Sequence, residues 1–190
     1  MDLHQWMTSD LVAMRARLFD SVVAMVPPER WHEHVDGGGS SVTHLLLHVA
    51  RHQDLAVNTV VRGDTPLFAA HRAALGLAQA HDGVGLAERE ETDLTALVPA
   101  EPLVAYLTET FDTTRDWLDA LGSMVLDATP NAPYRLTHLA GLDADRFSWL
   151  LGMWREKAIW WFVQWPVLGH GNAHVGEGIG VRNRMGLSPF

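Results

Sequence analysis

Apolar residues recur at helical spacing along four long segments, and this period constrains the fold more than any other feature of the chain. The first segment covers residues 3–26 and ends at "VPPER", where the prolines stop a helix. The others cover residues 41–62, 101–121 and 145–185, and we expect a kink or break in the last one at Pro166. No β-hairpin signal and no internal repeat accompany them. The pattern predicts an all-α protein.

The connections between these segments suggest how the helices are arranged. "HVDGGGSS" and "DATPNAPY" have the composition of loops, and "RGDTPLF" and "HDGVG" have that of turns. Residues 63–98 form a long connection in which "LAEREETDLTALV" is expected to hold a short helical piece. We therefore predict an up-and-down four-helix bundle, with residues 63–98 as a crossover and residues 1–190 as one domain.

Charge and composition exclude several classes of partner and site. The net charge of −9 comes without any Lys/Arg cluster, so we expect no nucleic-acid partner. The chain has no cysteine, which excludes disulfides, a thiolate metal site and a cysteine nucleophile. No apolar run reaches the ~20 residues that span a bilayer, and the N-terminal stretch is charged throughout, unlike a signal peptide. We expect a soluble, cytoplasmic protein that does not enter a membrane.

Histidines four positions apart are more frequent than chance predicts. The 11 histidines form three such pairs, whereas a random arrangement gives roughly 0.6. The pairs are His44/His48, His48/His52 and His170/His174. Residues four apart share a helix face, so both imidazoles of a pair can reach one metal ion. Taken alone, each pair is more typical of structural histidines, and His44 and His52 lie toward the edges of an apolar stripe, where solvent can reach them.

The run "GHGNAHVGEG" carries the strongest of these pairs. Glu177 lies on the same face, seven positions after His170 and three after His174. A carboxylate there can orient a ligand imidazole, bind the metal or accept a proton. Residues 169–180 also hold five glycines, each of which costs a helix ~1 kcal/mol relative to alanine. Glycines at such positions allow another helix or a substrate to approach closely, and leave room around an ion.

Two further features have a structural and a functional interpretation. Arg51 and Asp54 follow His48 by three and six positions, either as a plain surface pair or as part of a polar site wall. Tryptophans gather in the segment after residue 145, where packing in the core or at a subunit interface is the expected role, and a pocket wall is the less common one.

Three stretches of the sequence resemble DinB-like proteins. "SVTHLLLHVARHQDLAVNTVVRG" resembles the second helix of that family, and its "HVARHQD" is similar to a His-x-x-Arg-x-x-Asp variant. "WPVLGHGNAHVGEGIGVRNRMGL" resembles the last helix, in which His-x-x-x-His is followed by Gly-Glu, Arg and Gly-Leu. "HDGVGLAEREETDL" resembles the mid-chain connection. The similarity covers most of the chain through short, degenerate motifs, and Pro166 and the glycines depart from the plainer pattern of the last helix.

This resemblance implies an up-and-down four-helix bundle with a crossover, often a homodimer. It also implies a divalent metal, usually zinc or nickel, held by three histidines at one end of the bundle. By position these histidines are His48, His170 and His174, and His44 is the main alternative to His48. Characterised relatives transfer low-molecular-weight thiols such as bacillithiol, or use mycothiol to isomerise maleylpyruvate. The family name does not imply DNA binding.

Three imidazole ligands leave a coordination position open, as catalytic metal sites do. On the resemblance, a thiol or water would be activated there against a small-molecule substrate, with Glu177 as base or orienting group and Arg51 holding an anionic substrate. The sequence thus favours a metal-dependent thiol transferase or hydrolase. Two alternatives stay open. The protein could be a non-catalytic metal-binding protein that serves in a stress response or an interaction, or it could be a helical bundle whose histidines bind no metal.

Overall fold

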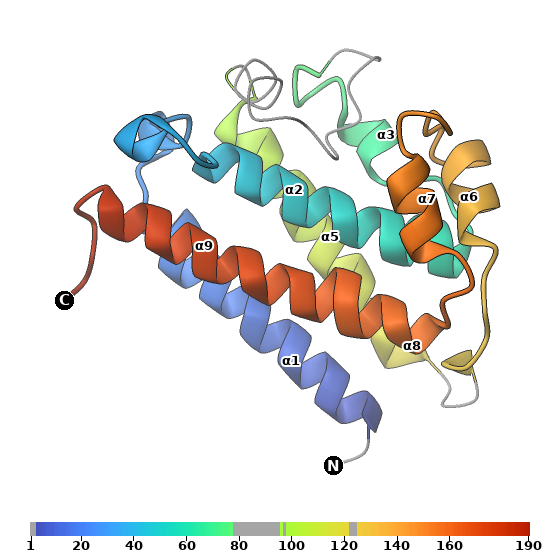
Figure 1. Ribbon diagram of the computed structural model, residues 1–190. Coiled ribbons are helices and arrows are strands. Elements are labelled where there is room, and N and C mark those ends of the chain that lie inside the picture. Colours follow the sequence, from blue (N-terminus) through green and yellow to red (C-terminus); the bar gives the residue numbers. More distant parts are fainter. Residues whose placement is uncertain (1–2, 78–95, 97, 122–124) are drawn as a thin grey trace.

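The predicted long helices are present in the computed structural model, which describes residues 3–77, 96, 98–121 and 125–190. Within these ranges there is no strand, so the all-α prediction is confirmed. The four long helices are α1 (Leu3–Leu18), α2 (Val42–Asp54), α5 (Ala100–Ala120) and α9 (His170–Arg184) (Figure 1). None of the described helices has the length and apolar character that crossing a bilayer requires.

Wider, π-helical turns extend three of these helices. They are η1 (Phe19–Val23) after α1, η4 (Leu55–Arg62) after α2, and η6 (Val163–Gly169) before α9. The second helical segment starts at Ser41, whose side chain accepts a hydrogen bond from the backbone N–H of His44 at 3.2 Å. It ends at Gly63, which has the left-handed conformation (φ 79°) that commonly terminates a helix.

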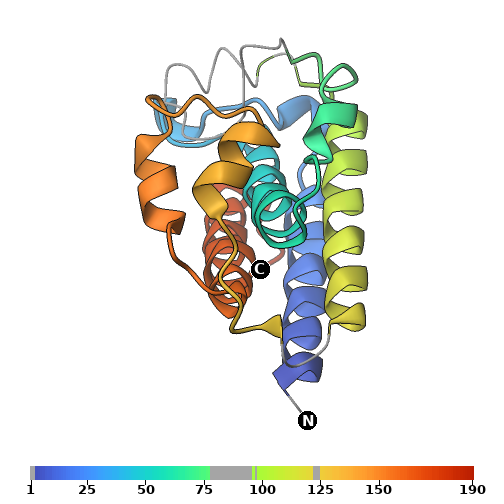
Figure 2. The ribbon, with the colours of Figure 1, turned by 90° about the vertical axis from the view of Figure 1, so that its right-hand side faces the viewer.

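The four long helices enclose a common core. Helix α2 packs against α5 and α9, and α1 packs against the same two helices from the other side. Figure 2 shows α1 beside α5, with the short helices α6 (Ala132–His138) and α7 (Ser148–Trp154) on the opposite side of α2. The core side chains include Leu11, Met14, Leu46, Leu107, Phe111 and Val175. This packing is compatible with the predicted bundle, whose up-and-down order and crossover stay predictions.

The last helical segment breaks at a different place from the one predicted. Arg155 has an extended backbone (ψ 135°) and Glu156 has a positive φ of 58°, which together separate α7 from α8 (Ile159–Phe162). Pro166 lies inside η6, and the helix continues through it into α9. Proline lacks an N–H and crowds the carbonyl four residues earlier, so it fits where the hydrogen-bond ladder is already widened. The chain therefore has no break at Pro166, while a kink there, the other predicted outcome, stays a prediction.

The connections also differ in part from expectation. "DATPNAPY", expected to be a loop, ends in the start of α6, where the Asn131 side chain accepts from the backbone N–H of Tyr134 at 3.2 Å. Asparagine before a helix with an early proline is a start signal. Within the long connection, α3 (Phe68–His71) is a short helix. "HDGVG" and all of "LAEREETDLTALV" except residues 96 and 98 lie outside the described residues.

Two glycines of α9 serve close helix packing. A Cβ at Gly171 would lie 2.5 Å from Met14 Sδ of α1, and a Cβ at Gly178 would lie 3.1 Å from Val22 Cγ2 of η1. By contrast, a Cβ at Gly180 would meet nothing within 4 Å. The predicted close approach of another helix is therefore the role of the first two, and it brings α9 against α1.

Candidate metal centre

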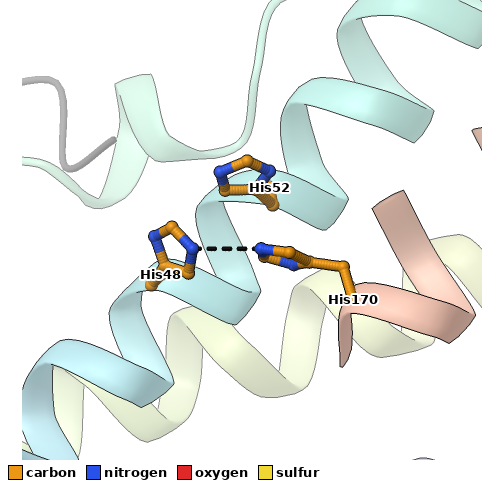
Figure 3. A group of neighbouring side chains, drawn as sticks. All are labelled: His48, His52 and His170. Carbon is orange, nitrogen blue, oxygen red and sulfur yellow. Dashed lines mark hydrogen bonds between the residues drawn. The ribbon is translucent and has the colours of Figure 1, made fainter. Parts of the chain in front are cut away.

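Four imidazole rings meet where α2 packs against α9. His48 and His52 come from successive turns of α2, and His170 and His174 from successive turns of α9. His170 Nε2 lies 3.1 Å from His48 Nε2 and also 3.1 Å from His174 Nε2. The ring centre of His52 lies 4.4 Å from that of His48 and 4.3 Å from that of His170. Figure 3 shows His48, His52 and His170 turned toward one another between the two helices.

The nitrogen atoms of this cluster fit a divalent metal ion. A tetrahedral site with metal–nitrogen bonds of about 2.0–2.1 Å places its ligand atoms about 3.3–3.4 Å apart. The two Nε2–Nε2 separations of 3.1 Å are close to this value. His48, His52 and His170 also offer nitrogen atoms that lie within 4.8 Å of one another. His52 Nε2 is buried without a hydrogen-bond partner, and coordination to an ion would satisfy it.

Burial keeps the rings of His48, His52 and His170 neutral, and neutral imidazole is the form that binds metal. It lowers the pKa of His48 to about 2, with the nearby His170 and His174 as the next causes. Burial likewise lowers the pKa of His170 to about 4 and holds the pKa of His52 well below its usual value. A lone pair is therefore available on each of these rings at neutral pH.

Glu177 is hydrogen-bonded to one ring of the cluster, that of His174. His174 Nδ1 donates to Glu177 Oε2 at 2.8 Å, which leaves the Nε2 lone pair of His174 directed at the cluster. This hydrogen bond is the largest of the causes that lower the pKa of Glu177, with a further contribution from a hydrogen bond to Ser40. By contrast, the Nδ1 atoms of His48 and His170 are buried without a hydrogen-bond partner. Glu177 is thus hydrogen-bonded to His174, whereas the roles predicted for it, as a group that orients a ligand imidazole, as a metal ligand or as a base, stay predictions.

His44 and His52 of α2 differ in their relation to the cluster, because only His52 belongs to it. His44 stacks on His48 with ring centres 5.4 Å apart, while the close group of nitrogen atoms consists of His48, His52 and His170. This grouping favours His48 over His44 as a ligand. His52 was expected at a solvated edge, but it is only 7% exposed and its ring makes a T-shaped contact with that of Trp154 of α7, with ring centres 6.1 Å apart. The four-residue spacing from His48 could have identified His52 as a member of the cluster. Nothing in the sequence indicated that α7 would cover its ring.

Arg51 lies outside the histidine cluster, on the neighbouring face of α2. Its side chain is buried, its Nη1 lies 3.6 Å from Asp54 Oδ2, and its guanidinium stacks over the Phe68 ring at 3.9 Å from the centroid. The interpretation of Arg51 and Asp54 as a plain surface pair is therefore wrong. The structure places Arg51 in the wall of a cavity beside α3, so its predicted contact with an anionic substrate remains open.

Comparisons with known proteins bear on both the fold and the family. The chain resembles a solved structure described as a conserved protein from Enterococcus faecalis, with a TM-score of 0.72, 16% identity and 97% of each chain covered. No curated protein matches the sequence. The model of the DinB superfamily matches residues 10–154, a range that includes His48 and Arg51 and ends before His170. Since this match spans well over half of the sequence, the chain belongs to the DinB superfamily.

Proposed function

We propose that this protein is a metal-dependent enzyme of the thiol transferase or hydrolase type, built on an up-and-down four-helix bundle. Its divalent metal, zinc or nickel, would be held by His48, His170 and His174. The observation that carries the proposal is the convergence of three Nε2 atoms from two helices, with His170 Nε2 3.1 Å from each of the other two. A donor set of three imidazoles suits both metals.

A bound metal of this kind lowers the pKa of a thiol or of water, so that a nucleophile forms at neutral pH. The residues of the chain would provide access for the substrate and would position the ligands. Glu177 is exposed, with 41% of its side chain accessible, and the His174 side chain that it contacts is 21% exposed, so substrate would arrive from their side. Glu177 would hold the His174 ring in place through the 2.8 Å hydrogen bond. The thiol would be of low molecular weight, as the family resemblance suggests.

A second candidate function rests on His52. A fourth buried imidazole at the same place can complete a tetrahedral set, and four-ligand sites are closed and structural rather than catalytic. The protein would then bind metal without catalysis, as a stress-response or interaction protein. The two candidates predict the same metal content but different reactivity.

Elemental mass spectrometry of untagged protein, never exposed to a nickel column, tests the site. We expect about one metal ion per chain in the wild type, and none in His48→Ala or His170→Ala. His138→Ala is the matched control, because this histidine lies on α6 and stacks on Tyr134 instead. Absence of metal after soaking with zinc or nickel would overturn both candidates. Metal at full occupancy, with no consumption of thiol or hydrolysis across a panel of electrophiles, would favour the second.

A further inference from the structure

Two tryptophan rings contact the histidine cluster, and they differ in their exposure to solvent. Trp154 of α7 makes a T-shaped contact with His52, and Trp165 of η6 makes one with His170, with ring centres 6.3 Å apart. Trp154 is 1% exposed, whereas Trp165 is 43% exposed. Trp154 is therefore part of the protein interior, and Trp165 lies where the cluster meets solvent.

A glycine determines where the Trp165 ring can lie. A Cβ at Gly169 would lie 3.0 Å from Trp165 Cε3 and 3.0 Å from the backbone oxygen of Gln164. Glycine therefore permits both the wide turn of η6 and the position of the indole against the helix, directly before His170. Exposure costs a large apolar ring the free energy that burial would give it. An exposed indole that is held beside His170 in this way indicates a role in contact with another molecule.

A series of contacts connects this indole with the other exposed groups of the site. The Trp165 ring contacts His170, His170 Nε2 lies 3.1 Å from His174 Nε2, and His174 is hydrogen-bonded to Glu177. The side chains of His174 and Glu177 are 21% and 41% exposed. A small molecule that reaches the cluster from solvent would thus have an indole on one side and a carboxylate on the other. Aromatic groups pair with an indole in offset or edge-to-face geometry, which adds to the gain from burial of their surface.

We propose that the exposed indole of Trp165 binds an aromatic group of a small molecule beside the histidine cluster. That this molecule is the substrate of the metal centre rests on the proposed function, and Trp165 would then determine a preference for aromatic substrates. The contact between the aromatic group and the indole does not depend on the metal.

Phenylmethanethiol and ethanethiol are suitable probes, titrated by calorimetry into zinc-loaded protein. We expect the aromatic thiol to bind about tenfold more tightly than the aliphatic one, and Trp165→Ala to remove most of this preference. The different intrinsic affinities of the two thiols for zinc cancel when the variants are compared. Trp165→Phe should keep the preference, because it keeps a ring. Trp149→Ala is the matched control, since Trp149 of α7 is 45% exposed and, among the described residues, its ring contacts none of the clustered histidines.

Fluorine NMR of metal-free protein labelled with 5-fluorotryptophan tests the contact without zinc. The chain has eight tryptophans, and the resonance that is absent from Trp165→Phe belongs to Trp165. We expect phenylmethanol to shift this resonance and to leave that of Trp149 in place.

The outcomes separate this proposal from the proposed function. An unchanged preference for phenylmethanethiol in zinc-loaded Trp165→Ala would overturn the role of Trp165 and leave the metal centre intact. If the chain takes up no zinc or nickel, the metal centre is refuted and the resonance of Trp165 decides. A shift with phenylmethanol would then support the aromatic contact, and no shift would overturn it.

Discussion

Replacing Gly171 with alanine should destabilise the protein, although alanine is the better helix former. A Cβ at this position would lie 2.5 Å from Sδ and 2.9 Å from Cε of Met14, whose side chain is 1% exposed. Met14 would have to move inside a packed core. Gly180→Ala is the matched control, because a Cβ there meets nothing within 4 Å and the residue lies on the same helix.

The two substitutions isolate the cost of the contact. Each gains ~1 kcal/mol of helix propensity, so this contribution cancels in the difference between them. Overpacking of a well-packed core costs typically ~1–3 kcal/mol. We therefore expect Gly180→Ala to be more stable than Gly171→Ala by ~1–3 kcal/mol, which corresponds to a melting temperature roughly 2–12 °C higher in a protein of this size.

Urea unfolding of the metal-free proteins, followed by circular dichroism, measures this difference. In a Met14→Ala background, Gly171→Ala should cost less stability than it does in the wild type, because the shorter side chain leaves room for the new methyl group. If Gly171→Ala is as stable as Gly180→Ala, α9 does not lie against α1 at Gly171 as described. The same displacement would move His170, the neighbouring residue, so we also expect weaker zinc binding in Gly171→Ala than in Gly180→Ala.

Three further predictions concern the histidines. Zinc at 100 times its dissociation constant should stabilise the wild type by ~2.7 kcal/mol, or roughly 5–11 °C in a thermal melt, and should leave the melting temperature of His170→Ala unchanged. Zinc titration against a competing chelator should show a greater loss of affinity in His174→Ala than in His52→Ala, and the reverse order would make His52 the third ligand. The folded protein lowers the pKa of His170 to about 4 from 6.5, chiefly through burial. The contribution of this neutral ring to the free energy of unfolding is therefore at its full value above pH 6.5, and it is lost as the pH falls toward about 4. Urea unfolding of metal-free protein over this range should show a steeper decline in the wild type than in His170→Gln, and equal slopes would refute this account.

The long helices and part of the candidate site could be predicted because both depend on local spacing. Apolar periodicity identified the segments that became α1, α2, α5 and α9. The four-residue spacing of histidines identified rings that share a helix face, and the structure brings the two faces together. A short helix such as α6 depends on one cap and few apolar residues, so its pattern is too weak to compete with a loop composition.

The burial of individual side chains could not be predicted, because it depends on distant segments. His52 is covered by Trp154 of α7, about one hundred positions later in the chain. Arg51 is enclosed because Asp54 binds the backbone at Leu67 and Phe68 and thereby holds α3 against α2. The break before α8 arises from the backbone of Arg155 and Glu156, neither of which is a residue type that commonly ends a helix.

The contact between His48 and His170 joins positions 122 residues apart. Closing a loop of this length in an unfolded chain costs about 4 kcal/mol of entropy, so a metal ion would seldom bridge the two before the helices have packed. A metal held by this pair would therefore leave the rate of folding nearly unchanged and slow the rate of unfolding. The lifetime of the folded chain, more than the speed at which it forms, would then depend on the supply of metal in its surroundings.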